Sequence, residues 1–322
     1  MKQQIPLVVV AGPTASGKTD MAIHLAKIFG GEIINADSMQ VYKELNIGSA
    51  KPSVEERQGI PHHMMDVVSV TNEYTVSQYE QQATEAIKDV YNREKLPIIC
   101  GGTGLYIRSL LYRMSFSNAI SDETIRRELT EYVNKNGKLS LHTMLSKVDQ
   151  KTAIRLHPND VKRVIRALEV YRVTGIPFSQ QDNNGKFEKK DIYCCILIGL
   201  QWPRQELVRR IKKRIDIMVD NGLLKEAKNI YDLHLPLSLP SMQGLGYKQF
   251  FSYFDGLCSL EEALEQTFIQ TRQFAKRQMT WFRHQEPEMH WIKADEPGAV
   301  IQAEQLVSEF ISNDSAARRE NR

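Results

Sequence analysis

The sequence predicts an α/β fold, in which a P-loop-type parallel sheet is flanked by helices and carries an inserted all-helical subdomain. The first observation is the stretch GPTASGKT at residues 12–19, which lies between an apolar run and an amphipathic helical pattern. The second is a series of short apolar runs at residues 32–36, 96–100 and 192–200, each typical of a buried strand. The third is the segment 117–190, where strand signals disappear and charged helical patterns replace them.

These patterns predict the domain boundaries. We expect a P-loop catalytic core domain formed by residues 1–116 and 191–312, and a helical insertion domain at residues 117–190. Within the insertion, helical patterns run over residues 123–134, 140–148 and 160–174. The polar residues 313–322 are expected to form a disordered tail.

The bulk composition limits the class of protein. A chain of 322 residues with 42% hydrophobic content can bury one large core and a smaller one. Its net charge of +3 neither requires nor excludes a nucleic acid, so the local clustering of Lys and Arg must decide. The four cysteines show no Cys-x-x-Cys spacing, which argues against a zinc site. Without a signal-peptide core or a membrane-spanning apolar run, we expect a cytoplasmic protein.

The residues of GPTASGKT suit the binding of phosphate. Gly12 and Gly17 allow the backbone to curl into a nest of N–H groups, with a helix N-terminus behind it. Lys18 supplies a mobile cation, and the Thr19 hydroxyl is placed to join a Mg²⁺ shell. A diphosphate or triphosphate is therefore expected to bind here, on Gly12, Pro13, Thr14, Ala15, Ser16, Gly17, Lys18 and Thr19.

The next two predicted strands end in informative residues. Asp37 follows the run at 32–36, and a carboxylate at the end of a strand in an open α/β sheet lies where ligands bind. The run at 96–100 leads into Gly101, Gly102 and Thr103, where a nucleotide-hydrolysing P-loop protein usually has a metal-binding Asp. This difference counts against an ordinary ATPase or GTPase. The glycines fit either a close approach to an anionic ligand or a tight turn alone.

Two other segments before the insertion contain patterned residues. A helix is expected from Thr75, a candidate N-cap, to residue 92. His62 and His63 are adjacent, so their side chains point in different directions, and no third ligand is spaced nearby. Metal binding is not expected at this pair.

Basic helices follow the sheet segments. In the insertion, Lys162 and Arg166 share one helix face, which fits a solvated face as well as a phosphate contact. Arg210 and Arg214 lie one turn apart beside an apolar stripe in a later helix.

The last strongly basic segment spans residues 271–283. Arg272, Lys276 and Arg283 border an apolar arc of this predicted helix. Cations at the edge of a buried face can point into a neighbouring groove, so this arrangement favours contact with a polyanion over a solvated face.

Eight motifs, spread over most of the chain, together resemble the bacterial tRNA dimethylallyltransferases, also called tRNA isopentenyltransferases of the IPP transferase family. They are GPTASGKT, INADSMQVY, IGSAKP, PHHMMD, CGGTGLY, KRVIRALEVYRVTG, MQGLGYK and TRQFAKRQMTWFR, in family order. The resemblance implies transfer of a dimethylallyl group from dimethylallyl diphosphate to N6 of the adenosine 3′-adjacent to the anticodon. The implied substrates are tRNAs that read codons starting with U, and the products are N6-dimethylallyladenosine and diphosphate.

The resemblance also implies roles for particular residues. An exocyclic amine is a weak nucleophile, and Asp37 is the natural base to remove its proton. Lys18, Thr19 with Mg²⁺, and a further cation would stabilise the leaving diphosphate, with Arg214 as first choice and Arg210 as second. Thr103 matches the position beside the reacting nucleotide. The implied partners are the anticodon stem-loop of tRNA and dimethylallyl diphosphate, with no membrane, and the protein is expected to be a monomer.

The residues expected to contact tRNA come from both predicted domains. They are Asp37, Ser38, Met39, Gln40, Thr103, Arg126, Lys162, Arg163, Arg166, Gln243, Gly244, Leu245, Gly246, Tyr247, Lys248, Arg272, Lys276 and Arg283. Two alternatives remain. One is a small-molecule kinase with ATP on the same P-loop, and the other is a nucleotide-gated RNA-binding module without catalysis, which leaves Asp37 unexplained.

Overall fold

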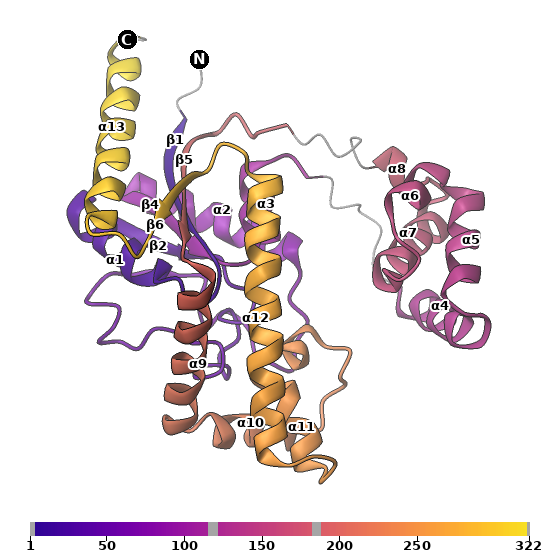
Figure 1. Ribbon diagram of the computed structural model, residues 1–322. Coiled ribbons are helices and arrows are strands. Elements are labelled where there is room, and N and C mark those ends of the chain that lie inside the picture. Colours follow the sequence, from indigo (N-terminus) through magenta and orange to yellow (C-terminus); the bar gives the residue numbers. More distant parts are fainter. Residues whose placement is uncertain (1–3, 115–121, 182–187, 321–322) are drawn as a thin grey trace. The chain divides into compact units, whose positions relative to one another are not determined.

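The computed structural model describes residues 4–114, 122–181 and 188–320 (Figure 1). Its contacts divide the chain into two compact units, Met1–Leu111 with Lys190–Arg322, and Tyr112–Lys189. The predicted domain boundaries differ from this division by a few residues. The first unit contains the sheet, and the second is built from helices.

The described residues form one six-stranded sheet in which all strand pairs are parallel. The spatial order is β3 (His62–His63), β2 (Gly31–Asn35), β4 (Leu96–Gly101), β1 (Ile5–Ala11), β5 (Tyr193–Gln201) and β6 (His290–Lys293). The P-loop-type parallel sheet is thus confirmed. The edge strands β3 and β6 were not anticipated, because runs of two and four residues are too short to give a periodic apolar signal.

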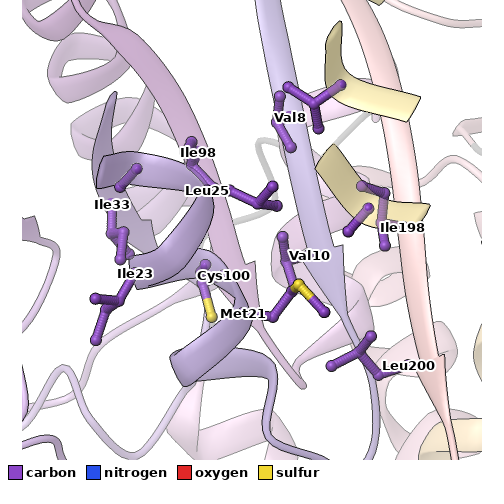
Figure 2. Packing of buried hydrophobic residues seen from close by; sticks show 14 of the residues in the cluster. Val8, Val10, Met21, Ile23, Leu25, Ile33, Ile98, Cys100, Ile198 and Leu200 are labelled. Carbon is purple, nitrogen blue, oxygen red and sulfur yellow. The ribbon is translucent and has the colours of Figure 1, made fainter. Parts of the chain in front are cut away.

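Helix α1 (Lys18–Phe29) covers one face of this sheet. Its residues Met21 and Leu25 pack against Val8 and Val10 of β1 in the main apolar core (Figure 2). The core extends to both neighbouring strands and to helix α13 (Ala299–Glu320). Strand β1, which leads into GPTASGKT, lies between β4 and β5, and its residues Leu7 to Ala11 are fully buried.

Six other described α-helices belong to this unit. They are α2 (Val76–Asn92), α3 (Gly104–Leu111), α9 (Arg204–Asp220), α10 (Leu223–Tyr231), α11 (Lys248–Phe254) and α12 (Leu260–Gln285), with a 3₁₀ turn, η1 (Pro240–Gln243). Thr75 caps α2 as expected, and its side chain forms a capping box with Gln78. In the described residues, no helix is both long enough and apolar enough to span a bilayer.

One expectation about the C-terminal segment is wrong. Residues 313–320, predicted to be a disordered tail, continue helix α13 as far as Glu320. The segment contains alanine, arginine and glutamate, which have high helix propensity, and it extends a helix that is already nucleated and packed upstream. Residues 321 and 322 lie outside the described part of the chain.

The second unit consists of α4 (Glu123–Asn136), α5 (Lys138–Val148), α6 (Gln150–Arg155), α7 (Val161–Thr174) and α8 (Phe178–Gln181). It has its own apolar core, to which four of these helices contribute. The core residues are Leu129, Leu141, Leu145, Ala153, Val164, Ala167 and Leu168. The all-helical character of the insertion is confirmed for its described residues.

Candidate active site

The P-loop connects β1 to α1 through a strained turn. Ala15 and Gly17 have positive φ angles of 63° and 83°, and Gly17 is the N-cap of the helix. A Cβ atom on Gly12 would lie 2.8 Å from Ser16 Oγ and 3.1 Å from the Leu200 carbonyl oxygen. The two glycines of the motif are therefore required by backbone conformation and by close packing.

Two side chains support this loop from outside. Arg210 of α9 donates from Nε to the Ala15 carbonyl at 2.8 Å, and its guanidinium lies 4.1 Å from the centre of the Trp202 ring. Trp202 in turn donates from Nε1 to the Ser16 carbonyl at 2.9 Å. Arg210 is thus engaged with the backbone of the loop. Trp202 carries no motif and was not identified from the sequence.

Two large cavities adjoin the P-loop in the described residues. The first, of about 740 Å³, is lined by loop residues including Lys18 and Thr19, by residues 50–54, and by Lys213 of α9. The second, of about 550 Å³, is lined by Asp37 and Thr103 and by residues of α12. Lys18 and Arg214 line both cavities. The structure therefore brings together four of the five predicted catalytic residues around one cavity, and Thr19 lines the other.

The loops that follow β2 and β4 are joined directly. The Thr103 backbone N–H donates to the Ala36 carbonyl at 3.0 Å, and the Ser38 N–H donates to Thr103 Oγ1 at 3.0 Å. Asp37 Oδ1 accepts from the Met39 N–H at 2.9 Å, which orients the carboxylate. A Cβ on Gly101 would lie only 2.1 Å from the Ala36 carbonyl oxygen. Close approach of the neighbouring backbone, and not of a ligand, accounts for that glycine.

The electrostatics of the site favour an anion. Partial burial lowers the pKa of the Lys18 ammonium, and the positive charge of Arg214 lowers it further. Burial likewise lowers the pKa of Arg214, whereas the Asp37 carboxylate raises it. Two partly desolvated cations thus adjoin the same two cavities, where a bound diphosphate would compensate for the water that they have lost.

A carboxylate holds the loop between the two cavities. Glu226 of α10 accepts hydrogen bonds from the backbone N–H groups of Asn46, Ile47 and Gly48 at 2.9–3.1 Å. The Tyr247 hydroxyl donates to the same carboxylate at 2.6 Å. Burial, followed by the charge of Glu226, raises the pKa of Tyr247. The sequence analysis missed Glu226, which has no distinguishing pattern around it.

Most of the predicted tRNA-contacting residues in the first unit line the second cavity. These are Asp37, Ser38, Met39, Thr103, Gln243, Gly244, Leu245, Gly246 and Lys248. The Tyr247 side chain is fully buried between Gly48 and Glu226 and does not line this cavity, so a contact of Tyr247 with tRNA stays a prediction. Gln40 is also buried, and it donates to the carbonyls of Ser49 and Ala50 at 3.1 Å.

Helix α12 presents different cations to the cavity from those expected. Arg272, Lys276 and Arg283 are exposed, but none of them lines the second cavity, whereas Arg277 does. Arg283 donates to Gln201 Oε1 at 3.3 Å. Arg277 was missed because the apolar arc was used to choose the bordering cations, and Arg277 lies one residue beyond Lys276 on the helix.

In the helical unit, most of the predicted tRNA-contacting cations have carboxylate partners. Arg126 and Arg166 bind the fully buried carboxylate of Glu169 at 2.8 and 2.7 Å. Arg163 binds Asp160 at 2.9 Å, and Lys162 is exposed. Arg126 and Arg166 therefore stabilise a buried charge within the unit, and a contact of these four residues with tRNA stays a prediction.

The histidine pair lies at the edge of the sheet, on β3. His63 Nε2 lies 2.7 Å from Glu32 Oε2, and His62 Nδ1 lies 2.8 Å from the Ile60 carbonyl oxygen. Burial lowers the pKa of His62. Across the described residues, no group of three or more His, Cys, Asp or Glu side chains is arranged to hold a metal ion.

Comparison with known proteins identifies the family. A family model described as IPP transferase matches residues 40–285, which is most of the chain. The chain belongs to the IPP transferase family. The matched segment includes Thr103, Arg214 and α12, whereas the P-loop and Asp37 precede it in the chain.

Curated relatives from the IPP transferase family align over nearly the full length. A tRNA dimethylallyltransferase from Shouchella clausii is 42% identical over 309 residues, covering 96% of this chain and 98% of the relative. A tRNA dimethylallyltransferase from Geobacillus thermodenitrificans is 45% identical over 291 residues, covering 90% and 91%.

Solved structures agree with the sequence relatives. The full-length tRNA isopentenylpyrophosphate transferase from Bacillus halodurans matches with a TM-score of 0.73 and 37% identity, covering 99% of this chain and 100% of that one. A eukaryotic dimethylallyltransferase acting on tRNA matches with a TM-score of 0.83 and 31% identity, covering 96% and 80%. The fold and the family assignment therefore rest on independent comparisons.

Proposed function

We propose that this protein transfers a dimethylallyl group from dimethylallyl diphosphate to N6 of the adenosine 3′-adjacent to the anticodon of tRNA. The tRNAs would be those that read codons starting with U. The observation that carries the proposal is one cavity lined by Lys18, Asp37, Thr103 and Arg214. It is supported by relatives that are named tRNA dimethylallyltransferases and are 42% and 45% identical over at least 90% of this chain.

In this proposal the diphosphate of the donor binds at the P-loop. The backbone N–H groups of residues 12–19 and the positive end of α1 favour an anion there. Lys18 and Arg214 stabilise the negative charge that develops as the carbon–oxygen bond to the dimethylallyl group breaks. Arg214 is the better candidate than Arg210, because Arg210 already donates to the Ala15 carbonyl.

The acceptor adenosine enters the cavity that contains Asp37. A base inside an anticodon loop must leave its stack to reach such a site. The N6 nitrogen forms a bond to the allylic carbon, the carbon–oxygen bond of the donor breaks, and diphosphate leaves. Asp37 accepts the proton from N6, while the hydrogen bond from the Met39 N–H keeps its carboxylate oriented. Thr103, held by Ser38 and Ala36, lies beside the reacting nucleotide.

Magnesium fits the residues at the P-loop. Mg²⁺ commonly binds through one or two protein groups together with the phosphates of a substrate, and it does not need a cluster of protein carboxylates. Thr19 lines the first cavity beside Lys18 and would supply its hydroxyl to the ion. The bound ion would neutralise charge on the diphosphate.

We further propose that the helical unit binds the tRNA stem through its exposed cations, that the enzyme is monomeric, and that it works in the cytoplasm. Lys162 and Arg163 are exposed on α7 and can approach phosphates. Size-exclusion chromatography with light scattering, with and without an anticodon stem-loop, would test the stoichiometry.

The alternative is a small-molecule kinase that uses ATP. The relatives named above support the prenyl transfer and not the kinase. The deciding experiment incubates the purified protein with unmodified tRNA and either dimethylallyl diphosphate or ATP. Modified adenosine and free diphosphate, formed without ATP hydrolysis, are expected. Phosphoryl transfer from ATP to a metabolite, with no change in the tRNA, would overturn the proposal.

A further inference from the structure

A single glutamine joins the two loops of the candidate active site. Gln278 of α12 accepts from the Thr14 backbone N–H through Oε1 at 2.9 Å. Its Nε2 donates to the Gly102 carbonyl at 2.9 Å. The P-loop and the loop that carries Thr103 are thus connected through one side-chain amide.

The environment makes this bridge rigid. Gln278 is buried, with an exposed fraction of 6%, so neither hydrogen bond exchanges readily with bulk water. The neighbouring turns of α12 are fixed as well, since Ala275 and Phe282 are buried against other parts of the unit. The amide is therefore attached to a packed helix and not to a mobile loop.

We propose that Gln278 is a positioning residue that sets the spacing between the P-loop and the Thr103 loop during prenyl transfer. The inference rests on the proposed function, in which the donor lies on the P-loop and the acceptor lies beside Thr103. Transfer requires the allylic carbon and N6 to approach closely and in line, and small errors in such spacing are costly. Gln278 lines the second cavity, but both ends of its amide are bound to backbone groups, so we expect it to act through the two loops.

The two ends of the bridge require an amide and not only a side chain of this size. Thr14 presents an N–H donor and Gly102 presents a carbonyl acceptor. A glutamate at position 278 could accept from Thr14 but would place an oxygen against the Gly102 carbonyl. A methionine would fill the space and leave both backbone groups unsatisfied.

The Gln278 amide also limits which residue can occupy position 102. A Cβ at position 102 would lie 2.3 Å from Gln278 Nε2, which is too close for any contact. The next nearest atoms, Gln278 Cδ and the Gly12 carbonyl oxygen, would be at 3.4 Å. Gly102 is therefore required by the amide of Gln278, and Gly102→Ala would break the bridge from the opposite end.

The kinetic test compares Gln278→Met and Gln278→Glu with the wild-type protein, using dimethylallyl diphosphate and an unmodified anticodon stem-loop. We expect kcat to fall roughly 10- to 100-fold in both variants, while the KM for each substrate changes less than about threefold. Gln278→Glu should be at least as impaired as Gln278→Met. Near-normal kcat in Gln278→Met would show a packing role only and would overturn the proposal, as would an effect confined to the KM of the donor.

Two further measurements separate positioning from folding. Gln82→Met is the matched control, because Gln82 accepts a hydrogen bond from the Tyr74 hydroxyl but lines neither cavity. It should leave kcat unchanged. Faster hydrogen exchange at the Thr14 amide is expected in Gln278→Met and not in the control. Unchanged exchange at Thr14 would contradict the bridge even if no activity were found.

A double-variant cycle completes the test. Gly102→Ala alone should reproduce the loss of kcat measured for Gln278→Ala. Combined with Gln278→Ala, it should cause no further loss, since both changes break the same connection. Additive losses would overturn the proposal. Failure of the proposed function itself would be recognised separately, because the wild-type protein would then form no modified adenosine.

Discussion

Arg214 of α9 and Arg166 of α7 both lie in basic helical stretches, yet their surroundings differ. Arg214 lines two cavities beside Lys18, and burial lowers its pKa. Arg166 binds the fully buried carboxylate of Glu169 at 2.7 Å, together with Arg126 at 2.8 Å. We propose that Arg214 binds an anion from outside the protein, whereas Arg166 neutralises a carboxylate within it.

The contrast shows why a cluster of cations in a sequence is ambiguous. A buried carboxylate without partners would be expensive, so the helical unit requires arginines for its own stability. At the P-loop, burial lowers the pKa of both Lys18 and Arg214, although the Asp37 carboxylate raises both pKa values, and the two cations line open cavities. Cations that neutralise a buried carboxylate should affect stability, and cations that line the cavities at the P-loop should affect the chemistry.

The largest effect is expected at the carboxylate that adjoins the P-loop cations. Asp37→Ala should lower kcat by about 10²- to 10⁴-fold, since it removes the base that accepts the N6 proton. Binding of tRNA should stay near normal, measured by filter binding or fluorescence anisotropy. A large loss of tRNA affinity with intact single-turnover chemistry would reject Asp37 as the base.

The comparison predicts the next largest effect at Arg214. Arg214→Ala should lower kcat/KM for dimethylallyl diphosphate by roughly 10²- to 10³-fold, because a cation that stabilises the leaving diphosphate is lost. The free energy of unfolding should change little. Arg210→Ala should instead disturb the loop through the lost hydrogen bond to Ala15. Equal kinetic effects with equal destabilisation would show that both arginines only support the loop.

The helical unit should respond in the opposite way. Arg166→Ala should lower the free energy of unfolding by about 1–3 kcal/mol, since the buried Glu169 carboxylate loses one of its two arginine partners. Urea unfolding of the full chain measures this effect, with exposed Lys162→Ala as the control. A stable Arg166→Ala variant with weakened tRNA binding would remove the distinction between the two units.

The smallest effects are expected for the exposed cations of α12. Arg272→Ala and Lys276→Ala should each weaken tRNA binding severalfold and flatten the salt dependence of the affinity by about one unit of slope. Arg277→Ala, at the wall of the second cavity, should reduce turnover as well as affinity. An unchanged salt slope for Arg272→Ala and Lys276→Ala would remove these two residues from the tRNA-binding surface.

Much of the fold could be predicted because the periodicity of apolar residues reports directly on burial. The strand before GPTASGKT, the Thr75 cap and the helical insertion were all visible in local patterns. The edge strands β3 and β6 were too short to show a period. The helix at 313–320 was missed because polar composition alone was taken as a sign of disorder.

The candidate site was predictable to the extent that its residues lie in motifs with a fixed backbone geometry. Lys18 follows from the P-loop pattern, and Asp37 and Thr103 follow from their positions at the ends of parallel strands. Gln278, Glu226 and Trp202 act through partners that are distant in the chain. Gln278, for example, binds residues 264 and 176 positions away, and no local pattern encodes such a contact.

The sequence by itself determined the α/β class, the phosphate-binding loop and the strand-end residues, because these depend on local backbone geometry and on short-range periodicity. Only the tertiary structure decided which cations line a cavity and which neutralise a buried carboxylate. The tertiary structure also shows why positions 101 and 102 are glycine. A Cβ at position 101 would collide with the Ala36 backbone, and a Cβ at position 102 would collide with the Gln278 amide. Those outcomes depend on which distant groups approach within hydrogen-bonding distance, and that is settled when the helices pack on the sheet.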